Sequence, residues 1–184
     1  IYPPFKSEFD PSTIVSYSIY NKTVIVTKEG EAQGIGDNSK SQISGSLNKI
    51  VLNSFRQIPL RDMHGQLCKA TSAVVGNDYT LYIISPEEDS LKLCYSHSNL
   101  DVEFPVVLNI TGNVIPASIY GGYSDCACIT TTGSIVYIHE SLYQHISNNI
   151  DPVLLPENQK AVNIACCYNF VIVLSVSGRV YQSK

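Results

Sequence analysis

The sequence has little charge and no concentration of either sign. Charged residues make up 15% of its 184 residues, tryptophan is absent and methionine occurs once. The 12 Lys and Arg are scattered and the formal net charge is -4, so the basic face that supplies nucleic-acid affinity is missing. No apolar run approaches the roughly eighteen residues of a membrane-spanning helix. We therefore expect neither a nucleic-acid partner nor a membrane span.

The N-terminus lacks the basic and apolar leader of a secreted protein, and the chain begins with Ile1. Hydrophobic residues make up 44% of the sequence, which excludes a disordered chain. The length suffices for one domain with a core or for part of a larger domain. We interpret the chain as a processed protein or a piece of a longer one, and expect it in the cytoplasm or, alternatively, in the nucleus.

The sequence also lacks Cys and His pairs at the spacing of a metal site. The six cysteines are Cys68, Cys94, Cys126, Cys128, Cys166 and Cys167. They fit no compact disulfide framework, and one Cys-x-Cys pair without a suitably spaced His pair is not a zinc pattern. Because side chains alternate along a strand, Cys126 and Cys128 should share one face. We expect reduced thiols, no metal site and no cofactor.

Motifs for nucleotide binding and catalysis are absent as well. The glycine-rich run Gly34–Asn38 follows an apolar strand, but a phosphate-binding loop needs Lys and then Ser or Thr after its last glycine, and neither occurs there. No Gly-x-Ser-x-Gly nucleophile motif is present. His139 opens half of a metalloprotease motif, yet Tyr143 stands where the second His is required. The sequence therefore predicts no catalytic residue, and we interpret the protein as a non-enzyme.

The sequence does contain a repeat. Four segments share an apolar strand, a polar turn and a second strand, and they start at Thr23, Leu81, Cys126 and Val171. The turn carries a glycine in three of them, at Gly30, Gly133 and Gly178. The second segment instead has Glu87, Glu88 and Asp89. Two-residue hairpin turns need a positive φ, which glycine adopts without steric cost, so turn geometry accounts for these glycines.

Each segment is preceded by another short strand, and the units recur at a spacing of about fifty residues, which is typical of propeller blades or solenoid turns. Val, Ile, Thr and Tyr dominate the runs. The runs "VIVTK" from Val24 and "VIVL" from Val171 are apolar at consecutive positions, which predicts strands covered on both faces. We therefore predict an all-β fold, a single propeller-type repeat domain over residues 1–184. Its blades of short antiparallel strands are expected at about 13–52, 69–108, 114–155 and 161–184, the last one incomplete.

The segment Thr23–Gly45 resembles the repeat of the regulator of chromosome condensation family. In that repeat an apolar strand, a turn and a second strand lead into Trp-Gly-x-Asn-x-x-Gly-Gln-Leu-Gly. The matching positions in the tail are Gly36, Asn38 and Gln42. Ile35 replaces the Trp, and two glycines are replaced by Ser41 and Ser44. The family's repeated His is replaced, in the four units, by Lys22, Tyr79, Asp125 and Phe170.

The resemblance implies a seven-bladed β-propeller, of which this chain would supply about three and a half blades. A partial propeller has open edges and an uncovered blade face, which favour aggregation. We therefore expect the remaining blades to come from the same longer chain or from a second chain. The resemblance implies a non-catalytic protein–protein interaction scaffold. The alternatives are a guanine-nucleotide exchange factor for a small GTPase, whose exchange residues find no match in this sequence, and a kelch-type propeller enzyme, which only "YGGY" at Tyr120–Tyr123 supports.

Interaction residues are expected at the turn tips, outside the strands. The candidates there are Lys28, Glu29, Glu87, Glu88 and Asp89, together with the polar loop 140–145. Tyrosine is frequent at binding hot spots, which adds Tyr120, Tyr123, Tyr137 and Tyr143. Gly30, Gly36, Gly133 and Gly178 are expected to be structural turn residues.

Overall fold

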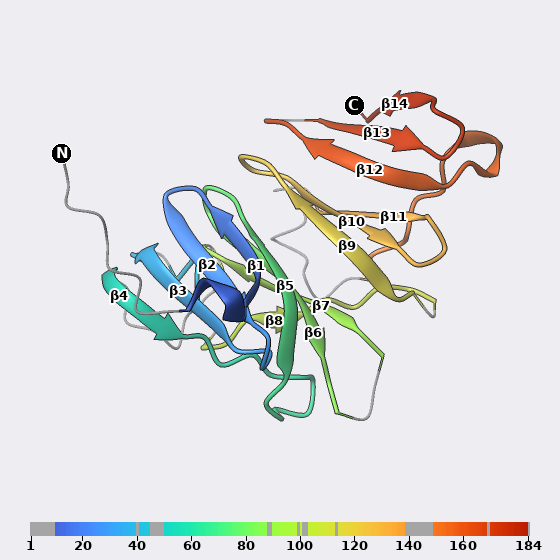
Figure 1. Cartoon of the computed structure of the whole chain (residues 1–184). Helices are drawn as coiled ribbons and strands as arrows, with labels where there is room; N and C mark the ends of the chain where they lie inside the picture. The colour runs from blue at the N-terminus through green and yellow to red at the C-terminus, as the bar shows by residue number, and fades with distance from the viewer. Residues whose placement is uncertain are drawn as a thin grey trace.

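The computed structural model describes residues 10–39, 41–44, 50–87, 90–98, 100, 103–112, 114–138, 149–168 and 170–183. These residues form four antiparallel sheets, which we number as blades 1 to 4 in chain order. The blades follow one another side by side from the blue to the red end of the chain in Figure 1. No helix in the described ranges is long and apolar enough to span a bilayer.

Within each blade the strands pair in the order in which the chain makes them. Blade 1 contains β1 (Ile14–Ile19), β2 (Lys22–Thr27), β3 (Ala32–Asp37) and β4 (Val51–Gln57). Blade 2 contains β5 (Lys69–Val75), β6 (Tyr79–Ser85), β7 (Lys92–His97) and β8 (Val106–Val107). Blade 3 contains β9 (Pro116–Gly121), β10 (Cys126–Thr130) and β11 (Ile135–Ile138), and blade 4 contains β12 (Ala161–Cys166), β13 (Val171–Ser175) and β14 (Val180–Gln182). Two short 3-10 turns, η1 (Pro11–Thr13) and η3 (Pro156–Asn158), precede blades 1 and 4.

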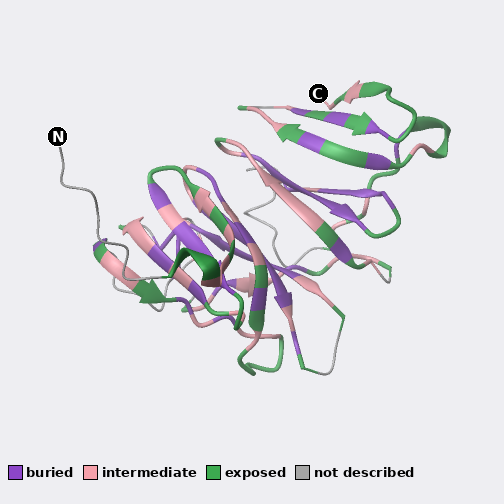
Figure 2. Cartoon of the chain, in the orientation of Figure 1, coloured by how far each residue is buried: buried purple, intermediate pink, exposed green. Residues whose placement is uncertain are grey.

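Each apolar core lies between two neighbouring blades. A blade with a neighbour on each side therefore buries both faces of its sheet. The core between blades 1 and 2 includes Val24, Ile43 and Tyr82. The core between blades 2 and 3 includes Leu81, Tyr95 and Val136. The core between blades 3 and 4 includes Ile129, Ile164 and Val173. Figure 2 shows the buried strands concentrated in blades 2 and 3.

The prediction that strands with consecutive apolar residues are covered on both faces is confirmed for β2 and is wrong for β13. Val24, Ile25 and Val26 are all buried. Along β13, by contrast, Val173 is buried whereas Ile172 and Leu174 are 36% and 39% exposed. Blade 3 covers one face of β13, and no described sheet covers the other face. An apolar run therefore does not by itself tell how many faces of a strand are covered.

In blades 1, 3 and 4 the second turn, which joins the second and third strands, contains a glycine with a positive φ. Gly30, Gly133 and Gly178 have φ of 86°, 84° and 80°. Each follows two turn residues, so the loops have three residues rather than the predicted two. In blade 1, for example, Thr27 N–H donates to Glu31 O and Gly30 N–H donates to Thr27 O. This is the arrangement in which a type I turn ends in a left-handed residue, a position that glycine suits.

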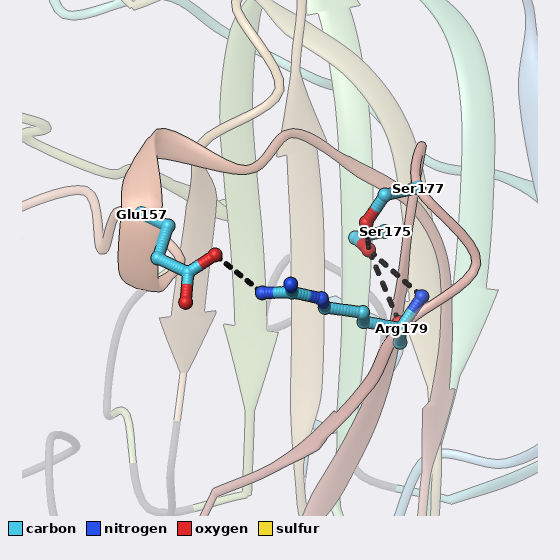
Figure 3. A network of polar contacts seen from close by, with 4 residues as sticks. All are labelled: Glu157, Ser175, Ser177 and Arg179. Atoms are coloured by element: carbon cyan, nitrogen blue, oxygen red, sulfur yellow. Dashed lines mark hydrogen bonds and ion pairs between the residues drawn. The ribbon is translucent and has the colours of Figure 1, made fainter.

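The second turn of blade 4 is joined to η3 by an exposed ion pair (Figure 3). The Ser175 hydroxyl accepts a hydrogen bond from Arg179 N–H at 3.2 Å and donates one to Arg179 O, also at 3.2 Å. The Arg179 guanidinium pairs with the Glu157 carboxylate. Because both side chains are mostly in water, the pair orients the turn more than it stabilises the blade.

Residues 41–44, which follow β3 and correspond to the tail of the resembling repeat, are held by Asn38 and pack on blade 2. Asn38 Oδ1 accepts from Ile43 N–H at 2.8 Å and from Ser44 N–H at 3.1 Å, while its Nδ2 donates to Ser44 O. Three hydroxyls of blade 2 then donate to the tail carbonyls of residues 41–43, and they belong to Ser96, Thr80 and Tyr82. The run 34–38 thus ends β3 and holds the tail that contacts blade 2, and it is not a phosphate loop.

Candidate interaction surface at the first turns

In blades 1 and 2 the first turn, which joins the first and second strands, is fixed to the next blade by the residue at the position of the family's His. In blade 1 this residue is Lys22, which is 2% exposed. Its Nζ donates to Gly76 O at 2.6 Å and to Asn77 O at 3.0 Å, both in the first turn of blade 2. Burial lowers the pKa of Lys22 to about 8, against the opposing effect of the carboxylates of Asp78 and Asp37. The ammonium group is therefore committed to the contact between the blades.

Tyr79 makes the equivalent connection from blade 2 to blade 3. Its ring is fully buried, and its hydroxyl lies 2.8 Å from Asp125 O and 3.1 Å from Gly122 O, the two carbonyls to which it can donate. The same hydroxyl accepts from Gly122 N–H at 3.1 Å. A lysine and a tyrosine thus perform the same task at the same repeat position, because both side chains are long and end in a hydrogen-bond donor.

Asp125 and Cys166 lie at the contact between blades 3 and 4. Asp125 is fully buried, and burial first and the neighbouring Asp125 carboxylate next raise the pKa of Tyr137. Burial and then the Asp125 charge raise the pKa of Cys166 to about 12. A thiol with so high a pKa is a poor nucleophile at neutral pH.

All six cysteines are free, and Cys126 and Cys128 face the same core, which confirms that they share a face. Burial raises the pKa of Cys128 to about 12 and raises that of Cys126 as well. Among the residues that the structure describes, no group of three His, Cys, Asp or Glu could hold a metal ion.

The first turns of the four blades contact one another through hydrogen bonds to backbone carbonyls. Asn21 Nδ2 donates to Asn77 O at 3.3 Å, and Asn77 N–H donates to Tyr123 O at 2.8 Å. The Ser124 hydroxyl donates to Tyr168 O at 2.6 Å. Blades 1 to 4 are therefore connected in sequence at one end of their strands.

Three exposed tyrosines lie together on these turns: Tyr20, Tyr123 and Tyr168, which we call the tyrosine cluster. The rings of Tyr20 and Tyr123 are perpendicular with centroids 6.0 Å apart, and those of Tyr123 and Tyr168 are tilted by 39° at 5.1 Å. Their exposed fractions are 49%, 41% and 61%. Of the three, only Tyr123 was among the predicted interaction residues. The other two occupy the same position of the repeat, two residues before Lys22, Asp125 and Phe170, and this recurrence was the signal that could have found them.

A pocket of about 210 Å³ opens beside the tyrosine cluster. Its lining residues come from three blades: Asn77, Asp78, Tyr79 and His97 from blade 2, Tyr123 and Ser124 from blade 3, and Tyr168 from blade 4. The Asp78 carboxylate accepts from Asn77 Nδ2 at 2.7 Å. His97 stacks on Tyr95 at 5.9 Å, and burial lowers the pKa of His97 to about 4, so its imidazole is neutral at physiological pH.

The predicted turn-tip residues do not join this surface. Lys28, Glu29 and Glu87 are exposed at the second turns, which lie at the opposite end of the second strands from the tyrosine cluster. Tyr120 and Tyr137 are half-buried and pack against the core between blades 3 and 4. The candidates Glu88, Asp89 and Tyr143, and the loop 140–145, lie outside the described residues.

Two glycine assignments have packing reasons rather than turn reasons. Gly36 lies inside β3, opposite Lys22, where the pairing with β4 shifts register, and not in a turn. The adjacent Gly121 and Gly122, which suggested a kelch-type unit, lie where blades meet. A Cβ on Gly121 would be 2.4 Å from Val74, and one on Gly122 would be 2.7 Å from Cys166 O.

No protein-family model matches the chain, and none of the curated proteins matches it in sequence. Solved structures do match it in shape. Prp20p from Saccharomyces cerevisiae, whose structure was described with its binding properties to Gsp1p and histones, is similar with a TM-score of 0.67 and 14% identity. That similarity covers 97% of this chain and 46% of Prp20p.

Human WBSCR16 is similar with a TM-score of 0.66 and 15% identity, over 88% of this chain and 44% of WBSCR16. Yeast RCC1 (Prp20) bound to Kap60 gives a TM-score of 0.65 and 14% identity, over 95% of this chain and 44% of the other. The chain thus spans less than half the length of these structures. It has the fold of an RCC1-like repeat propeller, present in part as four blades, and the predicted fold class is confirmed.

Proposed function

We propose that this chain is a non-catalytic scaffold that binds another protein through the tyrosine cluster. The observation that carries the proposal is the contact of Tyr20, Tyr123 and Tyr168 on one exposed surface. Tyrosine offers a large apolar ring with a polar tip that tolerates water, and it is enriched at binding hot spots. The three rings come from three different blades, so the surface exists only in the folded propeller.

The rigid support of these rings also favours binding. The turns that carry them are fixed by Lys22, by the Tyr79 hydroxyl and by the backbone bond from Asn77 to Tyr123. A surface that is ordered before the partner arrives loses less conformational entropy on binding. The two basic groups nearby are committed or neutral, because Lys22 binds backbone oxygens and His97 is uncharged. This supports recognition rather than proton-transfer chemistry.

The test is a comparison of variants as bait for partners. The wild type, Tyr123→Ala and Tyr168→Ala are immobilised, and the captured proteins are quantified by mass spectrometry. Lys28→Ala is the matched control, because Lys28 is exposed at the other end of the strands. We expect a protein that the wild type and the control retain and that both tyrosine variants lose. Equal capture of every protein by all four baits would contradict the proposal.

Guanine-nucleotide exchange on a small GTPase is a second candidate, favoured by the similarity to Prp20p, whose structure was described with its binding to Gsp1p. It is tested by the rate at which labelled nucleotide leaves a GTPase of that kind. An acceleration that grows with the concentration of the chain supports exchange. An unchanged rate at concentrations where the two proteins bind leaves the scaffold without exchange activity.

We also propose that a further blade covers blade 4. At the contact between blades 3 and 4, Gly133 O accepts from Ala161 N–H at 2.9 Å, and at that between blades 1 and 2, Gly30 O accepts from Ala70 N–H at 2.8 Å. The same turn in blade 4 carries Gly178, and no atom lies within 4 Å of a Cβ built on it. A first strand belonging to another blade would fit there.

The uncovered face of blade 4 supports the same conclusion. It exposes four apolar side chains, Val162, Ile172, Leu174 and Val180. We propose that the additional blade comes from a longer form of this chain or from a second chain. Light scattering after gel filtration tests this: a discrete dimer of the 20.2 kDa chain, or aggregation, agrees with an open face. A stable monomer at high concentration would contradict it.

A further inference from the structure

The pocket beside the tyrosine cluster has the size of one side chain. Its volume of about 210 Å³ is smaller than the range of about 300–1,000 Å³ of ordinary small-molecule sites. Two of its lining residues, Tyr123 and Tyr168, belong to the tyrosine cluster. The pocket is therefore continuous with the surface proposed to bind a partner, and it suits one residue of that partner.

The charges around the pocket favour a cation. Of the described residues that line it, only Asp78 is charged, and it is half-buried, so its charge is less screened than on an open surface. Lys22, whose charge acts on Asp78, is buried, and its Nζ donates to three oxygens, from Asn21, Gly76 and Asn77. His97 is neutral, so the described lining residues contribute no positive charge.

The aromatic walls favour the same kind of ligand. The face of a tyrosine ring attracts ammonium and guanidinium groups, most strongly when the cation leaves water. Tyr123 and Tyr168 line the pocket from adjacent blades, and their rings contact each other with a tilt of 39° and centroids 5.1 Å apart. An anionic ligand would gain nothing from these rings and would be repelled by Asp78.

We propose that this pocket binds the side chain of a lysine or arginine in an extended basic segment of the partner protein, with the cation against Tyr123 and Tyr168 and paired with the carboxylate of Asp78. The inference rests on the proposed scaffold function and names the chemistry of its partner. Residues flanking that cation would contact Tyr20 and the apolar side chains of Tyr17 and Ile19, which are 70% and 67% exposed on β1. This apolar surface is the reason to expect a peptide segment rather than a free amine.

The test titrates the isotope-labelled chain with small probes and follows the backbone amide signals by NMR. Butylammonium and ethylguanidinium represent the two cations, and butyrate at the same ionic strength represents an anion. We expect the cations to shift the amides of residues 77, 78, 123 and 124 and butyrate to leave them unchanged. Equal shifts with butyrate, or cation-induced shifts spread over the whole surface, would overturn the proposal.

Variants assign the effect to the pocket. Asp78→Asn should weaken cation binding about 2- to 5-fold, as expected for a partly exposed ion pair. Tyr168→Leu, which keeps an apolar side chain at an exposed position, should weaken it by a similar factor of about 2 to 5. The matched control is Glu87→Gln, which removes an exposed carboxylate at the other end of the sheet and should change nothing. Unchanged binding to Asp78→Asn would contradict the assignment.

A peptide pair separates this inference from the function on which it rests. A labelled Gly-Leu-Arg-Leu-Gly peptide should bind more tightly than ethylguanidinium, and its Gln counterpart should bind at least about 5-fold more weakly. If the tyrosine variants lose a captured partner but no cation binds, the scaffold stands and the pocket assignment fails. If cations bind but the tyrosine variants capture the same proteins as the wild type, the scaffold proposal fails instead.

Discussion

Blades 3 and 4 both have a five-residue central strand of four apolar residues and a final hydroxyl residue, and they differ in what packs against it. All five residues of β10 are buried, because blade 2 covers one face and blade 4 the other. Along β13 every second residue is exposed. Their second turns differ in the same way: a Cβ on Gly133 would be 2.6 Å from Lys160, whereas one on Gly178 meets nothing within 4 Å. The comparison teaches that burial in a propeller strand is decided by its neighbours more than by its own residues.

The strongest test of this difference places a charge on each face of β13. Val173→Asp puts a carboxylate into the core between blades 3 and 4, and it should lower the free energy of unfolding by about 4 kcal/mol or more. Leu174→Asp on the open face should cost less than about 1 kcal/mol. Urea denaturation of both variants measures the difference. Similar losses in the two would show that something covers the open face in solution.

Lys22 provides a test at the contact between blades 1 and 2. The equivalent repeat position in blade 4 is occupied by Phe170. Because burial lowers the pKa of Lys22 to about 8 in the folded chain from 10.5, the folded chain releases this proton first as the pH rises. Between pH 8 and 10.5 the unfolded chain binds more protons, so the contribution of Lys22 to stability increases with pH, by about 3 kcal/mol in all. Below pH 8 both states are protonated and the contribution is constant.

The measurement is the free energy of unfolding of the wild type minus that of Lys22→Met, from pH 7 to 11. Other lysines and tyrosines titrate in this range in both proteins, so the subtraction isolates Lys22. A difference that stays flat with pH would mean that the Nζ contacts with Gly76 O and Asn77 O fully compensate for burial.

The two second-turn glycines give a smaller and matched comparison. Alanine at either position is strained by a φ near +80°, which should cost about 1 kcal/mol. Gly133→Ala should cost about 1 kcal/mol more than Gly178→Ala, because its Cβ would also displace the Lys160 side chain. Thermal unfolding of the two variants gives the ranking. An equal cost would mean that the Lys160 side chain moves aside freely.

The smallest expected effect is a gain in stability in the tail of blade 1. Ser41 has a φ of 65°, at a position where the resembling repeat has glycine. Ser41→Gly should raise the free energy of unfolding by about 0.5–1 kcal/mol by relieving this strain, less the entropy that glycine loses on folding. Ser41 O would still accept from the Ser96 hydroxyl, since that bond uses the backbone. A loss of stability would show that the Ser41 side chain makes a contact worth more than the strain.

The hairpins were predictable from the sequence because their signals are local. A glycine between two apolar runs is enough to identify the second turns at Gly30, Gly133 and Gly178. The exposure of Ile172 and Leu174 was not predictable, because it depends on a sheet that would have to stand next to β13. No property of "VIVL" itself carries that information.

The candidate site was predictable only in part. Tyr20, Tyr123 and Tyr168 share one repeat position, so aligning the four units would have brought them together. Asp78 and His97 could not have been assigned to the same pocket, because β5, β6 and β7 must first fold and meet blades 3 and 4. The predicted turn tips Lys28, Glu29 and Glu87 are exposed but lie at the other end of the strands, and their role in binding stays a prediction.

The placement of every core between neighbouring blades has a consequence for how the chain opens. Blades 2 and 3 each share two cores, whereas blades 1 and 4 each share one. Of the two end blades, blade 4 has exposed residues along its central strand, and the central strand β2 of blade 1 has none. Stability in such a series is close to a sum of nearest-neighbour terms, so an end unit with an uncovered central strand detaches at the lowest cost. The amide protons of β12 to β14 should therefore exchange with solvent while those of β6 and β10 remain protected. Fraying of this kind would also carry Tyr168 away from Tyr123, so the integrity of the tyrosine cluster reports on whether the last blade is closed.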